Sequence, residues 1–186
     1  MLAAAASTDP ATGAAMPIPP EPVIGAASAD DAGEIWTLQR AAFVDEAQLY
    51  GDPFILPLAE TADNVRRAVE GAGHVLTAVE GHRIVGAVRG RAEDATGLLN
   101  RLCVAPDRRH RGIGRALVRA LEERMAHAHP GLAAFTVFTG QQNEAHLRLY
   151  RSLGYTEAGR ERMSDHLALV HMRKAVPGRE PRPATV

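Results

Sequence analysis

The sequence predicts an α/β protein: one domain with a central mixed β-sheet and helices on both faces. Its length of 186 residues fits a single domain with a sizeable core. Strand and helix patterns follow one another in the order β-α-α-β-β-β-α-β-α-β-β, so strands alternate with helices late in the chain but not early. That order is typical of a mixed sheet covered on both sides.

The first elements are a short strand and a long helix. The strand begins at Pro22-Val23-Ile24. Ser28, with Asp31 three residues on, resembles a capping box that uses Asp in place of Glu. The helix that follows carries an inward stripe of four residues, namely Ile35, Leu38, Gln39 and Ala42.

A loop or broken helix is predicted for residues 45–58, because this stretch contains Gly51, Pro53 and Pro57. Thr61 can cap a second helix over residues 62–70. Two glycines then end that helix.

The remaining elements form the body of the sheet. The segment 97–104 is apolar on both faces, which indicates a central strand. Other strands are predicted at 74–79, 83–89, 135–139, 155–160 and 166–173, the last two as an antiparallel pair, and helices at 112–127 and 144–153.

The two ends of the chain differ from this pattern. Residues 1–22 hold seven alanines and five prolines, and residues 177–186 hold three prolines, so we expect flexible segments around a domain at 23–176.

Composition narrows the classes of function. A net charge of −1 gives no overall attraction to nucleic acid or to an anionic membrane. No apolar run reaches the ~18 residues of a membrane span, and no basic residue precedes Arg40, so a cytoplasmic protein is expected. Cys103 is the only cysteine, which excludes an intrachain disulfide and makes a cysteine-based metal site improbable.

The segment from Leu102 to Leu117 carries the chemistry. A strand ends there, the chain turns through a loop with four arginines, and a helix begins at Gly112 and Gly114. Unpaired N–H groups at the start of a helix, the helix dipole and nearby arginines together predict an anion site that suits phosphate. A P-loop would need Gly-Lys-Ser/Thr, and the dinucleotide fingerprint would need a third glycine where Leu117 stands, so both of those patterns fit poorly.

Two motifs resemble the GNAT superfamily of N-acetyltransferases. Arg109-x-x-Gly112-x-Gly114, preceded by Val104-Ala-Pro, is similar to the family's acetyl-coenzyme A (acetyl-CoA) binding motif. The segment from Asn143 to Tyr155 is similar to its Asn-x(6)-Tyr-x(3)-Gly-Phe/Tyr signature. The element order resembles the GNAT fold over about 150 of the 186 residues.

The resemblance implies a set of site residues. It implies that the motif strand separates from its neighbour after Val104 and that the backbone of Leu102, Cys103 and Val104 pairs with the acetyl and pantetheine amides. The turn would hold the pyrophosphate through Arg109, His110, Arg111, Gly112, Ile113, Gly114 and Arg115. Asn143 matches an asparagine that contacts the pantetheine arm. Tyr150 matches a tyrosine that protonates the departing thiolate, a step that a phenol can perform when it lies within hydrogen-bond reach.

The general base departs from the family pattern. Relatives often place an acid on the motif strand or near the end of the next one, but the corresponding residues here are Leu98 and Phe138. Deprotonation could use water, backbone carbonyls or an acid of the 45–52 loop, for which Glu46 is the candidate. A substrate amine of low pKa would need no base.

Several of these residues have purely structural alternatives. The two motif glycines could serve tight strand–helix packing, and Asn143 could cap the next helix. Cys103 on a central strand is expected to be an inert buried thiol. His146 could contact the coenzyme or fill space.

The acceptor is expected to be the primary amine of a small molecule. The first helices normally shape this pocket, and their connection carries Glu46, Tyr50, Asp52 and Phe54, a set that suits a cationic amine. The predicted function is acetyl transfer from acetyl-CoA as cosubstrate, without a metal. Acetylation of a protein N-terminus or lysine, a non-catalytic acyl-coenzyme A sensor and homodimer formation stay open.

Overall fold

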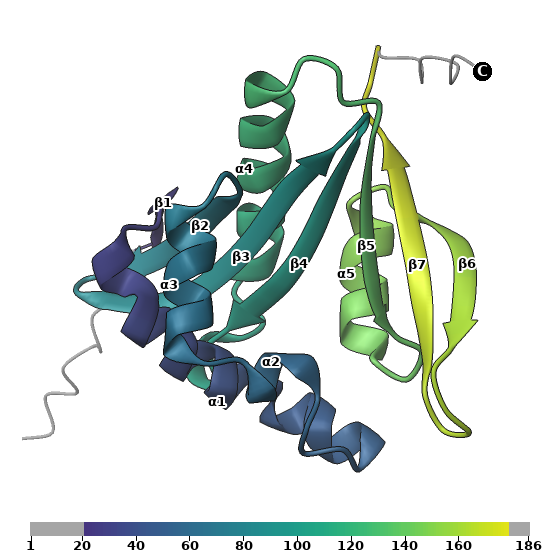
Figure 1. Cartoon of the computed structure of the whole chain (residues 1–186), viewed down its shortest axis with the longest axis horizontal. Coiled ribbons are helices and arrows are strands. Elements are labelled where there is room, and N and C mark those ends of the chain that lie inside the picture. The colour runs from purple at the N-terminus through teal and green to yellow at the C-terminus, as the bar shows by residue number, and fades with distance from the viewer. Residues whose placement is uncertain (1–20, 179–186) are drawn as a thin grey trace, which may run out of the picture.

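The structure is a computed structural model that describes residues 21–178. The predicted flexible segments therefore lie almost entirely outside the described residues. A seven-stranded sheet runs through the molecule in the order β1-β2-β3-β4-β5-β7-β6 (Figure 1). The strands are β1 (Val23–Ala26), β2 (His74–Glu80), β3 (Arg83–Glu93), β4 (Thr96–Val104), β5 (Ala134–Gly140), β6 (Thr156–Arg162) and β7 (Ala168–Ala175). The helices are α1 (Ala32–Tyr50), α2 (Leu56–Ala59), α3 (Ala62–Glu70), α4 (Ile113–Ala128) and α5 (Glu144–Ser152).

The sheet is mixed, as the sequence predicts. Every neighbouring pair of strands is antiparallel except β4 and β5, which run parallel across the α4 connection. The predicted central strand is β4, the fourth of the seven.

Helices cover both faces of the sheet. On one face, an added Cβ at Gly86 would lie 2.8 Å from a Leu117 methyl group, so α4 packs directly on the glycines of β3. Tyr155 lies on the same side and donates a hydrogen bond of 2.7 Å to Glu122 of α4. On the other face, Arg89 of β3 reaches Gln39 of α1 at 3.0 Å.

The predicted loop or broken helix over residues 45–58 is a broken helix. Helix α1 runs to Tyr50 and ends at Gly51, which has a φ of 63°, and the chain becomes helical again at α2. Two local predictions are wrong. Strand β3 extends to Glu93, four residues past the prediction, and His166 lies in the β6–β7 turn instead of on the final strand.

The predicted helix caps are confirmed. Ser28 and Asp31 form the capping box, with a hydrogen bond of 2.7 Å from Ser28 N to the Asp31 carboxylate, although it opens a short 3₁₀ turn that leads into α1. Thr61 accepts a hydrogen bond from Asn64 N at the start of α3.

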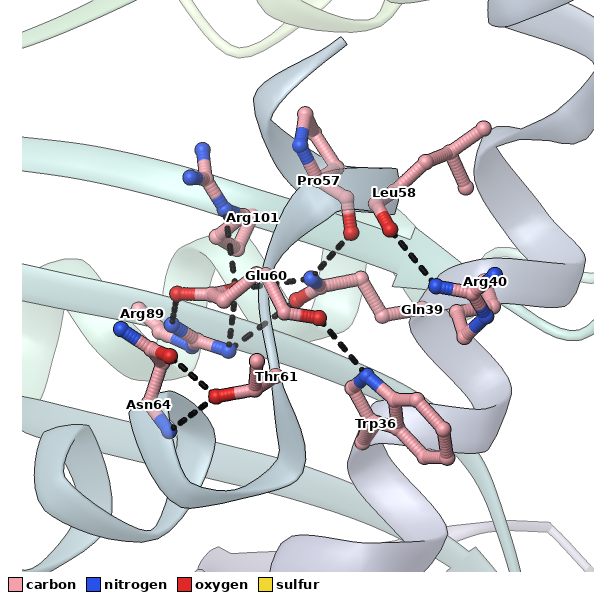
Figure 2. A network of polar contacts seen from close by, with 10 residues as sticks. All are labelled: Trp36, Gln39, Arg40, Pro57, Leu58, Glu60, Thr61, Asn64, Arg89 and Arg101. Carbon is pink, nitrogen blue, oxygen red and sulfur yellow. Dashed lines mark hydrogen bonds and ion pairs between the residues drawn. The ribbon is translucent and has the colours of Figure 1, made fainter. Parts of the chain in front are cut away.

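A buried polar network joins α1, the α2–α3 connection, β3 and β4 (Figure 2). The Glu60 carboxylate accepts hydrogen bonds from Arg89 at 2.9 and 3.1 Å and from Gln39 at 2.7 Å. It also accepts a longer one, 3.4 Å, from Arg101 Nε. The backbone oxygen of Glu60 accepts from Trp36 at 2.8 Å. One carboxylate thus fixes the first helices against the two central strands.

No helix within residues 21–178 is long and apolar enough to span a membrane.

Candidate active site

The site begins where β4 and β5 separate. Only three residue pairs join them, from Thr96↔Ala134 to Leu98↔Thr136, and beyond these the strands diverge (Figure 1). The separation therefore begins after Leu98, earlier than the Val104 predicted from the resemblance. Strand β4 stays paired with β3 as far as Val104, so residues 99–104 keep one edge open.

A β-bulge bends β4 at this open edge. Pairing with β3 shifts between Ala87↔Cys103 and Arg89↔Asn100, so two residues of β4 oppose one of β3. Arg101 lies in the bulge with a φ of 53°, a left-handed conformation that is uncommon outside glycine. The bulge directs this arginine toward the face that α1 and Glu60 occupy.

The turn after β4 leaves backbone N–H groups available. Gly112 has a φ of 82°, and the first bond of α4 runs from Ala116 N to Gly112 O. The N–H groups of residues 113–115 therefore lack acceptors within the helix. An added Cβ would meet nothing within 4 Å at Gly112 and only ordinary contacts of 3.6 Å or more at Gly114. Tight packing consequently does not explain either glycine.

The arginine side chains of this turn, which the sequence predicts to lie beside a phosphate, all have partners within the protein. Arg108 and Arg111 both bind Glu80, and Arg115 donates to Ser152 at 2.8 Å. Arg109 binds Asp45 and donates to the Ala42 carbonyl at 2.9 Å, which ties the turn to α1. In this structure the side chains shape the turn, and the backbone supplies the open hydrogen-bond donors.

A groove with a volume of about 530 Å³ follows the open edge of β4 to the start of α4. It is lined by most of the residues predicted for the coenzyme, namely Leu102, Cys103, Val104, Arg109, His110, Gly112, Ile113, Gly114, Arg115 and Asn143. Arg111 and Tyr150 are not among its lining residues. Arg111 is turned toward Glu80, and Tyr150 faces the neighbouring cavity.

That second cavity, of about 290 Å³, adjoins the groove. Its lining includes the four residues expected to shape the acceptor pocket, which are Glu46, Tyr50, Asp52 and Phe54, together with Tyr150 and Phe138. The groove and the cavity share the residues Phe43, Glu46, Leu102 and His146. Two substrates that entered from the two sides would therefore meet beside Glu46.

Asn143 links the polar groups at this junction. Its Nδ2 lies 3.1 Å from Glu46 Oε2 and 3.0 Å from His146 Nδ1, and its Oδ1 accepts from His146 N at 3.1 Å. The cap expected at this asparagine is thus present, and the same amide also orients the carboxylate. Burial raises the pKa of the Glu46 carboxyl, while the Asn143 hydrogen bond and the charge of Arg101 offset part of that rise.

His146 is a junction residue whose role the sequence left open. Burial lowers the pKa of its imidazole to about 4, and the charge of Arg109 acts in the same direction. The ring is therefore neutral near pH 7. With Nδ1 accepting from Asn143, its proton lies on Nε2. His146 lies three residues after the helix cap Asn143, and this spacing is the sequence signal that predicts their contact.

Tyr150 is 3% exposed and packs edge-on against His146 and Tyr155 at centroid distances of 6.2 and 5.6 Å. Burial, with the negative charge of Glu46, raises the pKa of its phenol, so the hydroxyl stays protonated throughout the physiological range. Cys103 is buried, and burial raises the pKa of its thiol to about 12. The thiol is therefore not a nucleophile at neutral pH, as the sequence predicts.

Comparisons with known proteins identify the family and the fold. The sequence matches the acetyltransferase (GNAT) domain family over residues 48–176. A comparison with curated protein sequences finds no significant match. The structure is similar to yncA from Salmonella typhimurium, solved with its cofactor acetyl-CoA (TM-score 0.70, 20% identity, 89% of this chain and 100% of that one). It is also similar to the ribosomal-protein-S18-alanine N-acetyltransferase from Escherichia coli (TM-score 0.69, 17% identity, 89% of this chain and 99% of that one). A third similar structure is the PaiA N-acetyltransferase from Thermoplasma acidophilum in complex with coenzyme A (TM-score 0.66, 16% identity, 83% of this chain and 99% of that one).

The family match covers well over half of the chain, so this protein belongs to the GNAT acetyltransferase family. It is an enzyme of the N-acetyltransferase class, built on the mixed sheet typical of that family.

Proposed function

We propose that the protein transfers an acetyl group from acetyl-CoA directly to the primary amine of a small molecule. The observation that carries this proposal is the meeting of the groove and the acceptor cavity beside Glu46, Leu102 and His146. A thioester in the groove and an amine in the cavity would be in contact there. No covalent enzyme intermediate is then needed, which agrees with the inert state of Cys103.

The groove supports binding of the coenzyme in a defined direction. The N–H groups at the start of α4, with the positive end of the helix dipole, suit the diphosphate. The open edge of β4 from Leu102 to Val104 offers backbone donors and acceptors to the amides of the pantetheine arm. The thioester would then reach the junction with the acceptor cavity.

Glu46 is the proposed general base. It takes a proton from the acceptor ammonium, and the freed nitrogen forms a bond to the thioester carbonyl carbon. A buried carboxyl with a raised pKa is a better base near neutral pH than an ordinary one. Asn143 holds the carboxylate in place.

Tyr150 is the proposed general acid. When the carbon–sulfur bond breaks, the electron pair stays on sulfur, and the phenol supplies the proton that makes the free thiol. The second proton of the attacking nitrogen then restores the phenol and leaves a neutral amide, while the proton held by Glu46 passes to solvent. Its position in the lining of the acceptor cavity places it close to the junction. Backbone N–H groups of the open strand could stabilise the negative charge on the carbonyl oxygen during the attack.

Acetylation of a protein N-terminus is the second candidate function. The structural similarity to a ribosomal-protein-alanine N-acetyltransferase favours it, as does an exposed apolar rim at Phe54, Leu56 and Met163. The small volume of the acceptor cavity, about 290 Å³, favours a small amine instead.

A thiol-release assay with acetyl-CoA tests the proposal against a panel of amines, antibiotics and peptides, and mass spectrometry identifies the product. We expect turnover with a small amine. Turnover with peptides alone would favour the second candidate. Tight acetyl-CoA binding without transfer to any acceptor would identify a sensor and refute catalysis.

A further inference from the structure

A third cavity, of about 370 Å³, lies between α3 and strands β2 to β4. Its charged lining consists of four arginines against one glutamate, namely Arg67, Arg89, Arg91 and Arg101 with Glu60. His74 also lines it, and burial with the nearby charge of His129 lowers the pKa of that imidazole, so His74 is neutral near pH 7 and adds no charge. The cavity is strongly basic in a chain whose net charge is −1.

This basic cavity continues from the acceptor cavity. The two share Asn100, Arg101 and Phe138 as lining residues. A molecule whose amine lies beside Glu46 can therefore extend past Arg101 into a region of positive charge. The acceptor pocket is then charged at both ends, acidic at Glu46 and Asp52 and basic from Arg101 onward.

Arg101 is placed to contact such a molecule. Its Nε donates to Glu60 at 3.4 Å, and Figure 2 shows its terminal nitrogens pointing away from that carboxylate. The side chain is 19% exposed, while Arg89 beside it is 10% exposed and is occupied by Glu60 and Gln39. Burial opposes ionisation of Glu60, but hydrogen bonds from Arg89 and Gln39 and the charges of both arginines outweigh it and lower the Glu60 pKa. The ionised carboxylate thus positions Arg101 and leaves its outer face open.

The other arginines bring further positive charge. Arg67 projects from α3 and is exposed, and Arg91 is paired with Glu93 on the surface, where both side chains are at least half exposed. Exposed pairs of this kind are weak and exchange readily with a competing anion.

We propose that the acceptor carries an oxyanion, a carboxylate or a phosphate, on the side away from its reactive amine, and that Arg101 binds it. This inference rests on the proposed function and names its substrate class: amino acids, acidic peptides or aminoalkyl phosphates, in preference to polyamines. The lining of the basic cavity has four arginines and one glutamate, so its positive charge would repel a second ammonium group on the acceptor. Charge-assisted bonds from a guanidinium to an oxyanion contribute about 10- to 100-fold in affinity.

Matched amines test the proposal. ω-Amino acids of increasing length are compared with their amides, which differ only in charge, and ω-aminoalkyl phosphates are compared with the corresponding amino alcohols. We expect kcat/KM to be about 10- to 100-fold higher for the anionic member of each pair, mostly through KM. The carboxylate and phosphate series identify which oxyanion is preferred. Equal rates within every pair would overturn the proposal while leaving the acetyltransferase function intact.

Variants locate the effect. Arg101→Gln should abolish the preference for the anionic member, and Arg67→Gln should reduce it for the longer acceptors only. Arg66→Gln is the matched control, because Arg66 is exposed on the same helix and is not among the residues that line the cavity. It should leave the preference unchanged. An undiminished preference in Arg101→Gln would overturn the assignment of this residue.

Product binding provides a readout that does not need turnover. Calorimetric titration with N-acetylated ω-amino acids and their amides should show the same charge preference, lost in Arg101→Gln. If no amine is acetylated but this preference is found, the proposed function fails and the oxyanion site stands. If neither N-acetyl compound binds better than the other, the oxyanion site is refuted.

Discussion

Replacing Gly112 by Asp should separate the binding role of the turn from its structural role. Gly112 has a φ of 82° and open space around its Cα, so a side chain at this position strains the backbone without a clash. Gly81, in the β2–β3 turn, has a φ of 64° and equally open surroundings, but it is not among the lining residues of the groove. Gly81→Asp therefore carries the same backbone strain and the same added charge at a position that does not line the groove.

The expected magnitudes follow from these surroundings. A left-handed conformation costs an L-residue about 1–2 kcal/mol, so each variant should lose about 2–8 °C in Tm. A carboxylate on Gly112 would add repulsion toward the diphosphate. Two unit charges about 5 Å apart at an effective dielectric constant of about 20 repel by about 3 kcal/mol, which is about 100-fold in affinity. Gly112→Asn adds a side chain of the same shape without the charge and should lose far less.

Calorimetric titration with acetyl-CoA, combined with thermal denaturation, measures both effects. We expect Gly112→Asp to weaken binding by about 100-fold or more, while Gly81→Asp binds normally with a similar loss of Tm. Unchanged affinity in Gly112→Asp would show that no phosphate lies at the start of α4. Equal losses of affinity in Gly112→Asp and Gly81→Asp would mean that strain, and not the site, controls binding.

Three other substitutions test the chemistry and the framework. Tyr150→Phe should lower kcat by about 100-fold or more with little change in acetyl-CoA affinity, and an unaltered turnover across pH would exclude the acid role. Glu46→Gln should lower kcat/KM and remove the acidic limb of the pH profile of kcat/KM. In the wild type, kcat/KM should rise as pH increases through the raised pKa of Glu46. If the acidic limb persists in Glu46→Gln, the titrating group is not Glu46. Glu60→Gln leaves Arg89 without a counter-ion and should cost about 3–5 kcal/mol of unfolding free energy at pH 7. Because the Glu60 pKa is lowered in the folded protein, this difference should be complete above the ordinary carboxyl pKa of about 4.5 and should shrink as pH falls from there through the lower pKa of the folded state. Denaturant titrations at pH 7 and pH 3 measure it, and an equal loss at both would contradict the ionic account.

The parts of the fold that the sequence predicts are those with local signals. Thr61 and Asn143 identify their helix starts because a cap bonds to an N–H only three residues away. The glycine turn identifies the start of α4 for another local reason, since glycine readily adopts the positive φ found at Gly112. The break after α1 is predicted for a local reason as well, since Gly51 and the prolines after it interrupt the helix between Tyr50 and Leu56.

The features that the sequence does not predict depend on contacts between distant segments. Arg109 appears free in the sequence, but its partner Asp45 is 64 residues away. The positive φ of Arg101 follows from the register between β3 and β4, which no local pattern encodes. The basic cavity likewise collects its charged side chains from α3, the connection before it, β3 and β4, which are far apart in the sequence.

The opening between β4 and β5 requires support from outside the sheet. Strands that lose their partners leave backbone groups unpaired at a cost, and they tend to close or twist to recover hydrogen bonds. Here the bulged part of β4 is anchored by Arg101, which lies in the bulge, and by Arg89 of β3, which lies at its edge; both bind Glu60. The same network binds Gln39 of α1, the helix that also contains Glu46. The positive charge of Arg101 lowers the pKa of the Glu46 carboxyl. The contacts that anchor the bulged strand therefore also influence the charge of the cavity beside Glu46. Under the proposed function, the choice of acceptor and the geometry of the coenzyme groove would depend on this one set of contacts.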